Sequence, residues 1–129
     1  MYKELIISII IVALIFSLNY VTQKNTDITV ETVTEKLNTV RNSALEEAPN
    51  KAKVTSDINI AYDKWEELDD IMAYYIEHDE LEKVKTALTS AKSYIEVEEY
   101  LESIEAIDKC IYILDHIHEK EMFSLDNIL

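Results

Sequence analysis

The run from Leu5 to Val21 constrains this chain more than any other feature. It reads LIISIIIVALIFSLNYV, carries no charge, and has only two serines and one asparagine as polar interruptions. As an α-helix it would be roughly 25 Å long, close to the hydrocarbon thickness of a bilayer, about 30 Å. A core helix of a soluble protein would carry a polar stripe, which this run lacks. We therefore predict a single transmembrane helix that contacts membrane lipid through residues 5–21.

The residues that follow this run predict that it is retained. Removable signal peptides end in small residues of the A-x-A kind, and the sequence SLNYVTQKNTD after Phe16 offers no such site. We expect residues 1–24 to form an uncleaved signal anchor. Lys3 and the α-amino group favour a cytoplasmic N-terminus, although Glu4 and Lys24 reduce that bias. The expected product is a single-pass protein of the cell membrane with an extracytoplasmic domain.

The rest of the chain, residues 25–129, is strongly acidic. The protein has a formal net charge of −14, and 25 of its 26 acidic residues but only 10 of its 12 basic ones follow residue 24, which gives that part −15. Phosphate groups of nucleic acids and anionic lipid headgroups repel such a domain, so we expect no nucleic-acid partner. The charge is compatible with a basic protein partner or with loose cation binding, and a solvated surface is the simpler explanation.

Composition also predicts the fold class. The chain has no glycine and one proline, Pro49, whereas tight β-hairpins depend on glycine-containing turns. Apolar residues recur at spacings of three and four, as on one face of a helix. The apolar seams expected in the core are Val30, Val33, Leu37, Val40 and Ala44; Val54, Ile58, Ala61, Trp65, Leu68, Met72 and Tyr75; Leu81, Val84, Leu88, Ala91 and Ile95; and Tyr100, Ile104, Ile107, Ile111, Leu114 and His118. We predict an all-α protein in which the transmembrane helix precedes an antiparallel, up-down four-helix bundle. The expected helices cover about residues 27–47, 51–77, 80–96 and 99–120, and an apolar tail follows at 122–129.

Three boundaries follow from local patterns. Asp27 or Thr29 is expected to cap the first bundle helix, which either continues the anchor as a stalk or folds back into the bundle. Asp79 and Glu82 have capping-box spacing, so a sharp turn is expected at His78 and Asp79. The apolar pattern shifts phase near residues 96–99, which predicts a short turn there. One continuous helix from 80 to 120 is the alternative.

Four residues are candidate metal ligands because the predicted bundle brings them to one end. Glu77 and His78 lie at a helix junction, and His116 and His118 lie near the end of the last helix. The two latter histidines are two residues apart and so lie on different helix faces, which is unlike the usual zinc spacing. A capped turn with His118 at the edge of the core is the simpler interpretation. We predict no metal, cofactor or catalytic residue.

Other chemically distinctive side chains fit a structural role. Trp65 lies on the apolar seam and is expected in the core, and Cys110 lies beside the seam as a buried thiol. Tyrosines outside the seam offer contact area for a partner, since tyrosine is favoured at interfaces. The sequence has no G-x-S-x-G, phosphate-binding loop or H-E-x-x-H motif, so we do not expect an enzyme.

Several short features resemble one protein family. An N-terminal anchor, Trp65 twelve residues before Glu77-His78-Asp79-Glu80-Leu81, and a terminal Asn127-Ile128-Leu129 resemble domain-of-unknown-function family 4363. The resemblance implies a small, membrane-anchored helical protein of the Gram-positive envelope, acting as an accessory to another membrane protein. The family has no established activity, so no functional residue is transferred from it.

Three hypotheses of function follow. The first is a non-catalytic, membrane-tethered interaction or accessory protein that docks on a protein partner in the same membrane. The second is an extracytoplasmic four-helix sensor or cation-binding module, and the third, the least supported, is a metal-dependent hydrolase. A homo-oligomer is an open alternative for the assembly.

Overall fold

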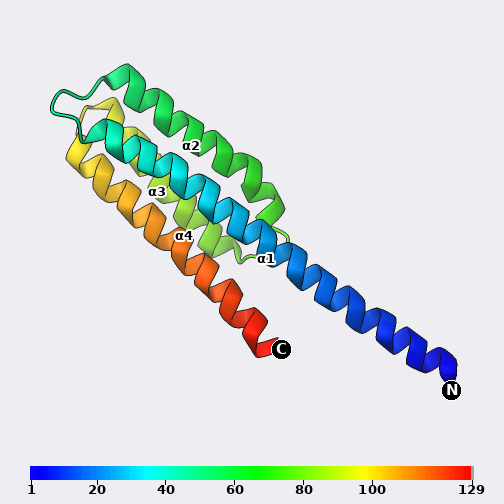
Figure 1. Ribbon diagram of the computed structural model, residues 1–129. Helices are drawn as coiled ribbons and strands as arrows, with labels where there is room; N and C mark the ends of the chain where they lie inside the picture. Colours follow the sequence, from blue (N-terminus) through cyan, green and yellow to red (C-terminus); the bar gives the residue numbers. More distant parts are fainter. Residues whose placement is uncertain (129) are drawn as a thin grey trace.

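Four helices make up almost the whole of the computed structural model, which describes the backbone of residues 1–128 and the side chains of residues 1–122. They are α1 (Tyr2–Ala44), α2 (Lys51–Met72), α3 (His78–Glu96) and α4 (Tyr100–Ile128). Each helix packs on its two neighbours in the cyclic order α1, α2, α3, α4 (Figure 1). The short links make neighbouring helices antiparallel, and no strand occurs within residues 1–128. The predicted up-down four-helix bundle is confirmed.

The apolar seams predicted from the sequence form one core. Trp65, Leu37, Leu88 and Leu114 are among its largest fully buried side chains. Most of the residues placed on the seams are buried in this core, and the others are partly buried: Val30, Leu68, Tyr75, Tyr100, Ile111 and His118. Burying a leucine-sized side chain contributes roughly 1.5–3 kcal/mol, so these seams are what hold the four helices together.

Helix α1 has two parts with different surroundings. Residues 2–21 project beyond the bundle with their apolar side chains exposed, whereas residues 22–44 pack against α2 and α4 (Figure 1). The helix is long and apolar enough to cross a membrane, and its most apolar stretch is not buried by any other part of the protein that the structure describes. We call the end of the bundle from which residues 2–21 project the proximal end, and the opposite end the distal end.

The predicted start of a separate helix at Asp27 or Thr29 is wrong, because α1 continues through this region without a break. The threonine hydroxyls donate hydrogen bonds to carbonyls of the preceding turn instead of capping a new helix. Thr22 donates to Asn19 (3.0 Å), and Thr29 donates to Asn25 (2.7 Å). The stretch therefore both continues the apolar segment and belongs to the bundle.

The link between α2 and α3 also differs from the prediction. Helix α2 ends at Met72, the link occupies residues 73–77, and His78 and Asp79 lie in the first turn of α3. Glu77 is the N-cap residue and makes no side-chain capping bond, so the predicted capping box is wrong. The acidic side chains at positions 79 and 80 instead interact favourably with the positive end of the helix dipole.

The turn between α3 and α4 confirms the shift of phase near residues 96–99 and excludes one continuous helix. The N–H of Glu99 donates to the carbonyl of Tyr94 (2.9 Å), and that of Glu98 donates to Ile95 (3.0 Å). This is the hydrogen-bond pattern of a Schellman motif, which usually has glycine at the left-handed position. Here Glu98 occupies that position with φ of 60°.

Helix α4 is longer than predicted, since it continues to Ile128 and does not end near residue 120. Its polar residues beyond Leu114 remain compatible with helix geometry, and no proline or glycine interrupts them. The predicted packing of the side chains of the apolar tail concerns residues beyond Met122, which lie outside the side chains that the structure describes.

Candidate functional site

A groove of about 1030 Å³ lies between α1 and α4. Both of its walls carry acidic side chains among polar and apolar ones. Helix α1 contributes Asp27, Val30, Glu31, Thr34, Glu35 and Asn38, and helix α4 contributes Asp108, Ile111, Tyr112, Asp115 and His118. We call this feature the acidic groove.

Helical spacing explains why these side chains face one another. Asp27, Glu31 and Glu35 are four residues apart and form one stripe along α1. Asp108 and Asp115 are seven apart and form the matching stripe along α4. Because α1 and α4 are antiparallel neighbours, the two stripes lie on opposite walls of the groove.

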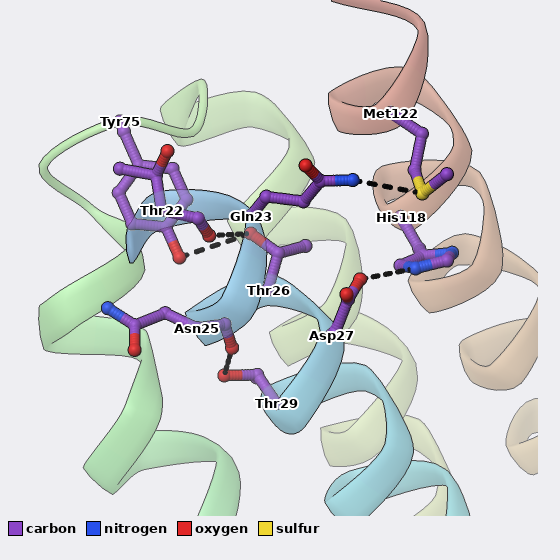
Figure 2. Close-up of polar contacts among 9 residues, drawn as sticks. All are labelled: Thr22, Gln23, Asn25, Thr26, Asp27, Thr29, Tyr75, His118 and Met122. Carbon is purple, nitrogen blue, oxygen red and sulfur yellow. Dashed lines mark hydrogen bonds and ion pairs between the residues drawn. The ribbon is translucent and has the colours of Figure 1, made fainter. Parts of the chain in front are cut away.

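One interhelical polar contact lies towards each end of the acidic groove. Arg41 Nε lies 3.0 Å from Asp108 Oδ1. At the proximal end, His118 Nε2 pairs with Asp27 Oδ1 (Figure 2). Within the described side chains, Glu31, Glu35 and Asp115 form no ion pair. The middle of the groove is therefore the part with uncompensated negative charge.

The groove also contains apolar contact area. Val30 and Ile111 are partly buried against the core. Tyr112 is 73% exposed at the rim and also lines a second groove between α3 and α4. Tyrosine combines a large apolar ring with a polar hydroxyl, which makes it a favoured anchor at protein interfaces.

The proximal end of the bundle is held by polar contacts to α1. Thr26 Oγ1 and Tyr75 Oη share a hydrogen bond of 3.1 Å, and Gln23 Nε2 lies 3.2 Å from Met122 Sδ (Figure 2). Burial raises the pKa of the Tyr75 hydroxyl, and the contact with Thr26 opposes that shift. These contacts attach the α2–α3 link and the end of α4 to the helix that enters the bundle.

Lys120 adds a further connection at the proximal end. Its Nζ lies 3.6 Å from Glu77 Oε2 and 3.9 Å from Glu80 Oε1. Glu80 is buried, and a cation beside a buried carboxylate offsets part of the cost of desolvating it. Helix α4 is thus joined by ion pairs to the start of α3 as well as to α1.

The structure brings the four candidate metal ligands towards this end of the bundle but does not group them around one point. Glu77 pairs with Lys120, and His118 pairs with Asp27. His78 Nε2 lies 3.5 Å from Glu82 Oε1 on its own helix, and His116 is exposed. Within the described part of the chain, no three side chains of the metal-binding types are grouped closely enough to hold an ion.

Cys110 and Trp65 occupy the places that the sequence predicts. Both are fully buried, and the Cys110 thiol lies 4.0 Å from the carbonyl oxygen of Val84. Burial raises the pKa of this thiol to about 12. It is therefore protonated at neutral pH and a poor nucleophile.

Sequence reasoning missed the acidic groove as a site. The acidic positions of α1 and α4 flank the apolar seams, and each stripe taken alone is typical of a solvated helix face. The spacing of four between Asp27, Glu31 and Glu35 was the available signal. Which other helix would lie beside that stripe depends on the handedness of the bundle, which helical periodicity does not specify.

Comparison with protein families gives one match. The family model described as Domain of unknown function (DUF4363) matches residues 15–128. The chain belongs to this family. The match covers all of the bundle and the last part of the apolar segment of α1, so the DUF4363 domain includes the helix that links these two regions.

No curated protein and no solved structure matches the chain.

Proposed function

We propose that this DUF4363 protein is a non-catalytic, membrane-tethered accessory protein of the bacterial envelope, which docks a partner membrane protein in its acidic groove. The observation that carries the proposal is the division of α1. Its first part exposes apolar side chains on every face, and its second part is one of the four bundle helices. This arrangement favours a bundle held next to a lipid surface.

The exposure of residues 2–21 supports insertion into a bilayer. Monomeric soluble proteins rarely expose continuous apolar surface of more than a few hundred Å², and a bilayer removes this surface from water. Continuity of the helix supports retention of the segment, because α1 has no break between it and the bundle. Lys3 on the N-terminal side of the apolar run supports an extracytoplasmic bundle, although Glu4 and Lys24 reduce that bias.

The position of the acidic groove supports a partner in the same membrane. Asp27 follows the end of the apolar run at Val21 by six residues, about 9 Å along a helix, and Asn38 lies about 17 Å further on. A helix that leaves the bilayer beside α1 would reach the groove directly. The carboxylates of Glu31, Glu35 and Asp115 favour lysine and arginine on that helix, while Tyr112 and Val30 provide apolar contact.

Photo-cross-linking in native membranes tests this docking site. A photoreactive amino acid at Tyr112 of the full-length protein is expected to give one discrete adduct with another membrane protein. Reversing the charge with Glu31→Lys, Glu35→Lys and Asp115→Lys should reduce that adduct about tenfold or more, because like charges then oppose docking.

The matched control reverses the same number of charges elsewhere. Asp63, Glu66 and Asp70 are exposed on α2, away from the groove, and lysine at these three positions should leave the adduct unchanged. Equal loss of the adduct in both triple variants, or no adduct from position 112, would contradict docking in the groove.

A further inference from the structure

Three large aliphatic side chains are exposed at the distal end of the bundle. Leu45, the C-cap residue of α1, is 51% exposed, Val97, the C-cap residue of α3, is 63% exposed, and Leu101 in the first turn of α4 is 77% exposed. The α1–α2 link and the α3–α4 turn lie at this same end (Figure 1). We call residues 45–50 and 97–102 the distal tip.

Core packing does not explain these three residues. The neighbouring Ala44, Ile95 and Ile104 already fill the end of the core. Single exposed apolar residues are common on protein surfaces, whereas a group of them surrounded by polar residues marks an interaction site. At the distal tip, three separate helix ends each expose one aliphatic side chain among polar residues.

The charge around the distal tip restricts what can cover it. Residues 45–53 and 96–102 contain six glutamates and two lysines. One lysine is already paired, since Lys53 Nζ lies 3.8 Å from Glu46 Oε1. A second copy of the tip and an anionic lipid surface would both be repelled. A protein surface with apolar residues and a basic rim is complementary to the tip in both respects.

The length of α1 also excludes the anchoring membrane as the occupant. Residues 22–44 of α1 separate the apolar segment from the distal tip. This part of the helix is about 34 Å long at about 1.5 Å per residue. With the apolar segment in a bilayer, the tip stands well beyond the headgroups of that bilayer.

We propose that the distal tip is a second docking surface, which binds a protein with a basic, apolar patch at about 30 Å from the membrane. This inference rests on the tether in the proposed function but not on docking in the acidic groove. Val97 and Leu101 supply the apolar contact, and the surrounding glutamates pair with the partner's lysines and arginines. The anchored bundle then holds this partner at a fixed distance from the membrane.

Cross-linking from the tip tests the inference in the full-length protein in native membranes. A photoreactive amino acid at Leu101 is expected to form an adduct with a protein whose cross-linked surface is basic. Leu45→Ser together with Val97→Ser should reduce this adduct about fivefold or more, as expected when apolar anchors are lost from an interface. Raising ionic strength from about 0.05 M to about 0.5 M should also reduce it, since salt screens exposed charges.

The control uses Ile60, which is 50% exposed on α2. Ile60→Ser should leave the adduct from position 101 unchanged. No adduct, an adduct with lipid or with a second copy, or an adduct with an acidic surface would overturn the inference. Because the groove is tested from position 112, an adduct from one position alone shows which of the two docking proposals fails.

Discussion

The two parts of α1 have the same backbone geometry and opposite surroundings. In residues 2–21 apolar side chains cover every face and none is buried by protein. In residues 22–44 the buried side chains fall on one stripe, which contains Thr26, Thr29, Val33, Leu37, Val40, Ser43 and Ala44. The distribution of apolar residues around the helix, not helix propensity, therefore decides which part enters the bundle.

The two parts of α1 join at residues 22–29 without a break in the helix. The stretch 22–29, which is polar except for Ile28, interrupts the apolar pattern, yet the helix does not end there. Hydroxyl groups of threonine satisfy carbonyls of the same helix, and Tyr75 and His118 contact this stretch from α2–α3 and α4. One unbroken helix thus connects the proposed anchor to the bundle, so that a tilt of one part is transmitted to the other.

The largest expected effect comes from placing charge in the apolar part of α1, which should prevent membrane insertion and leave the bundle folded. Val12→Arg with Ala13→Arg places two charges at the centre of the apolar segment, at a cost of about 5–7 kcal/mol for membrane insertion. We expect the variant to leave the membrane fraction while the circular dichroism of its bundle is unchanged. Val12→Leu with Ala13→Leu is the control. A doubly charged variant that stays in membranes would contradict the assignment of residues 5–21 as the anchor.

The next largest effect is on the stability of the bundle, not on membrane insertion. Leu37→Ala removes a fully buried side chain and should lower the free energy of unfolding of the bundle by about 2–5 kcal/mol. Leu14→Ala, in the exposed part of the same helix, should leave it unchanged. Chemical denaturation in detergent, followed by circular dichroism, measures both. Equal losses would show that residues 2–21 pack against the bundle.

A smaller effect on stability is expected at the α3–α4 turn, which is part of the bundle and not of the apolar segment. Glu98→Gly should raise the free energy of unfolding by about 0.5–1 kcal/mol, because glycine adopts positive φ without a steric cost. Glu96→Gly, at a helical position two residues earlier, should lower it by about 1 kcal/mol. Thermal unfolding of both variants provides the comparison. Destabilisation by both would argue against a left-handed residue 98.

The smallest expected effect concerns Glu121, next to the part of α4 that contacts α1. Burial raises the pKa of the Glu121 carboxyl, and Lys120 partly opposes the shift. A carboxyl whose pKa is raised by folding stabilises the bundle below its unfolded pKa of about 4.3, and this contribution is lost as pH rises through the folded value.

Glu121→Gln should therefore raise the Tm by about 1–2 °C at pH 8 and have no effect at pH 4. Glu119→Gln, at an exposed neighbouring position, is the control and should change neither value. Thermal scans at the two pH values measure the difference. An increase in Tm at pH 4 but not at pH 8 would contradict the buried position of Glu121.

Much of the fold follows from periodicity in the sequence. The seams containing Leu37, Trp65 and Leu88 were predicted as core, and the shift of phase near residues 96–99 predicted the turn at Glu98 without any glycine to mark it. Continuation of the anchor was one of two predicted alternatives, but the expected helix start at Asp27 or Thr29 was wrong. Threonine is favoured at helix N-caps, and its hydroxyl can also bond to a carbonyl of its own helix, so the residue type alone does not mark a boundary.

The candidate sites were harder to predict from the sequence than the fold. The separation of Glu77, His78 and His118 into different side-chain contacts depends on the rotation of each helix about its axis. The acidic groove depends on which two helices are neighbours. Periodicity identifies the buried face of each helix but neither of these relations.

The central claim is that residues 2–21 stay attached and hold the bundle at a membrane. Alkaline carbonate extraction of native membranes, followed by intact-mass measurement of the extracted and retained protein, tests it most directly. We predict that the protein remains in the membrane pellet with residues 2–21 intact. Release into the supernatant, or a mature protein that begins after Val21, would contradict the account.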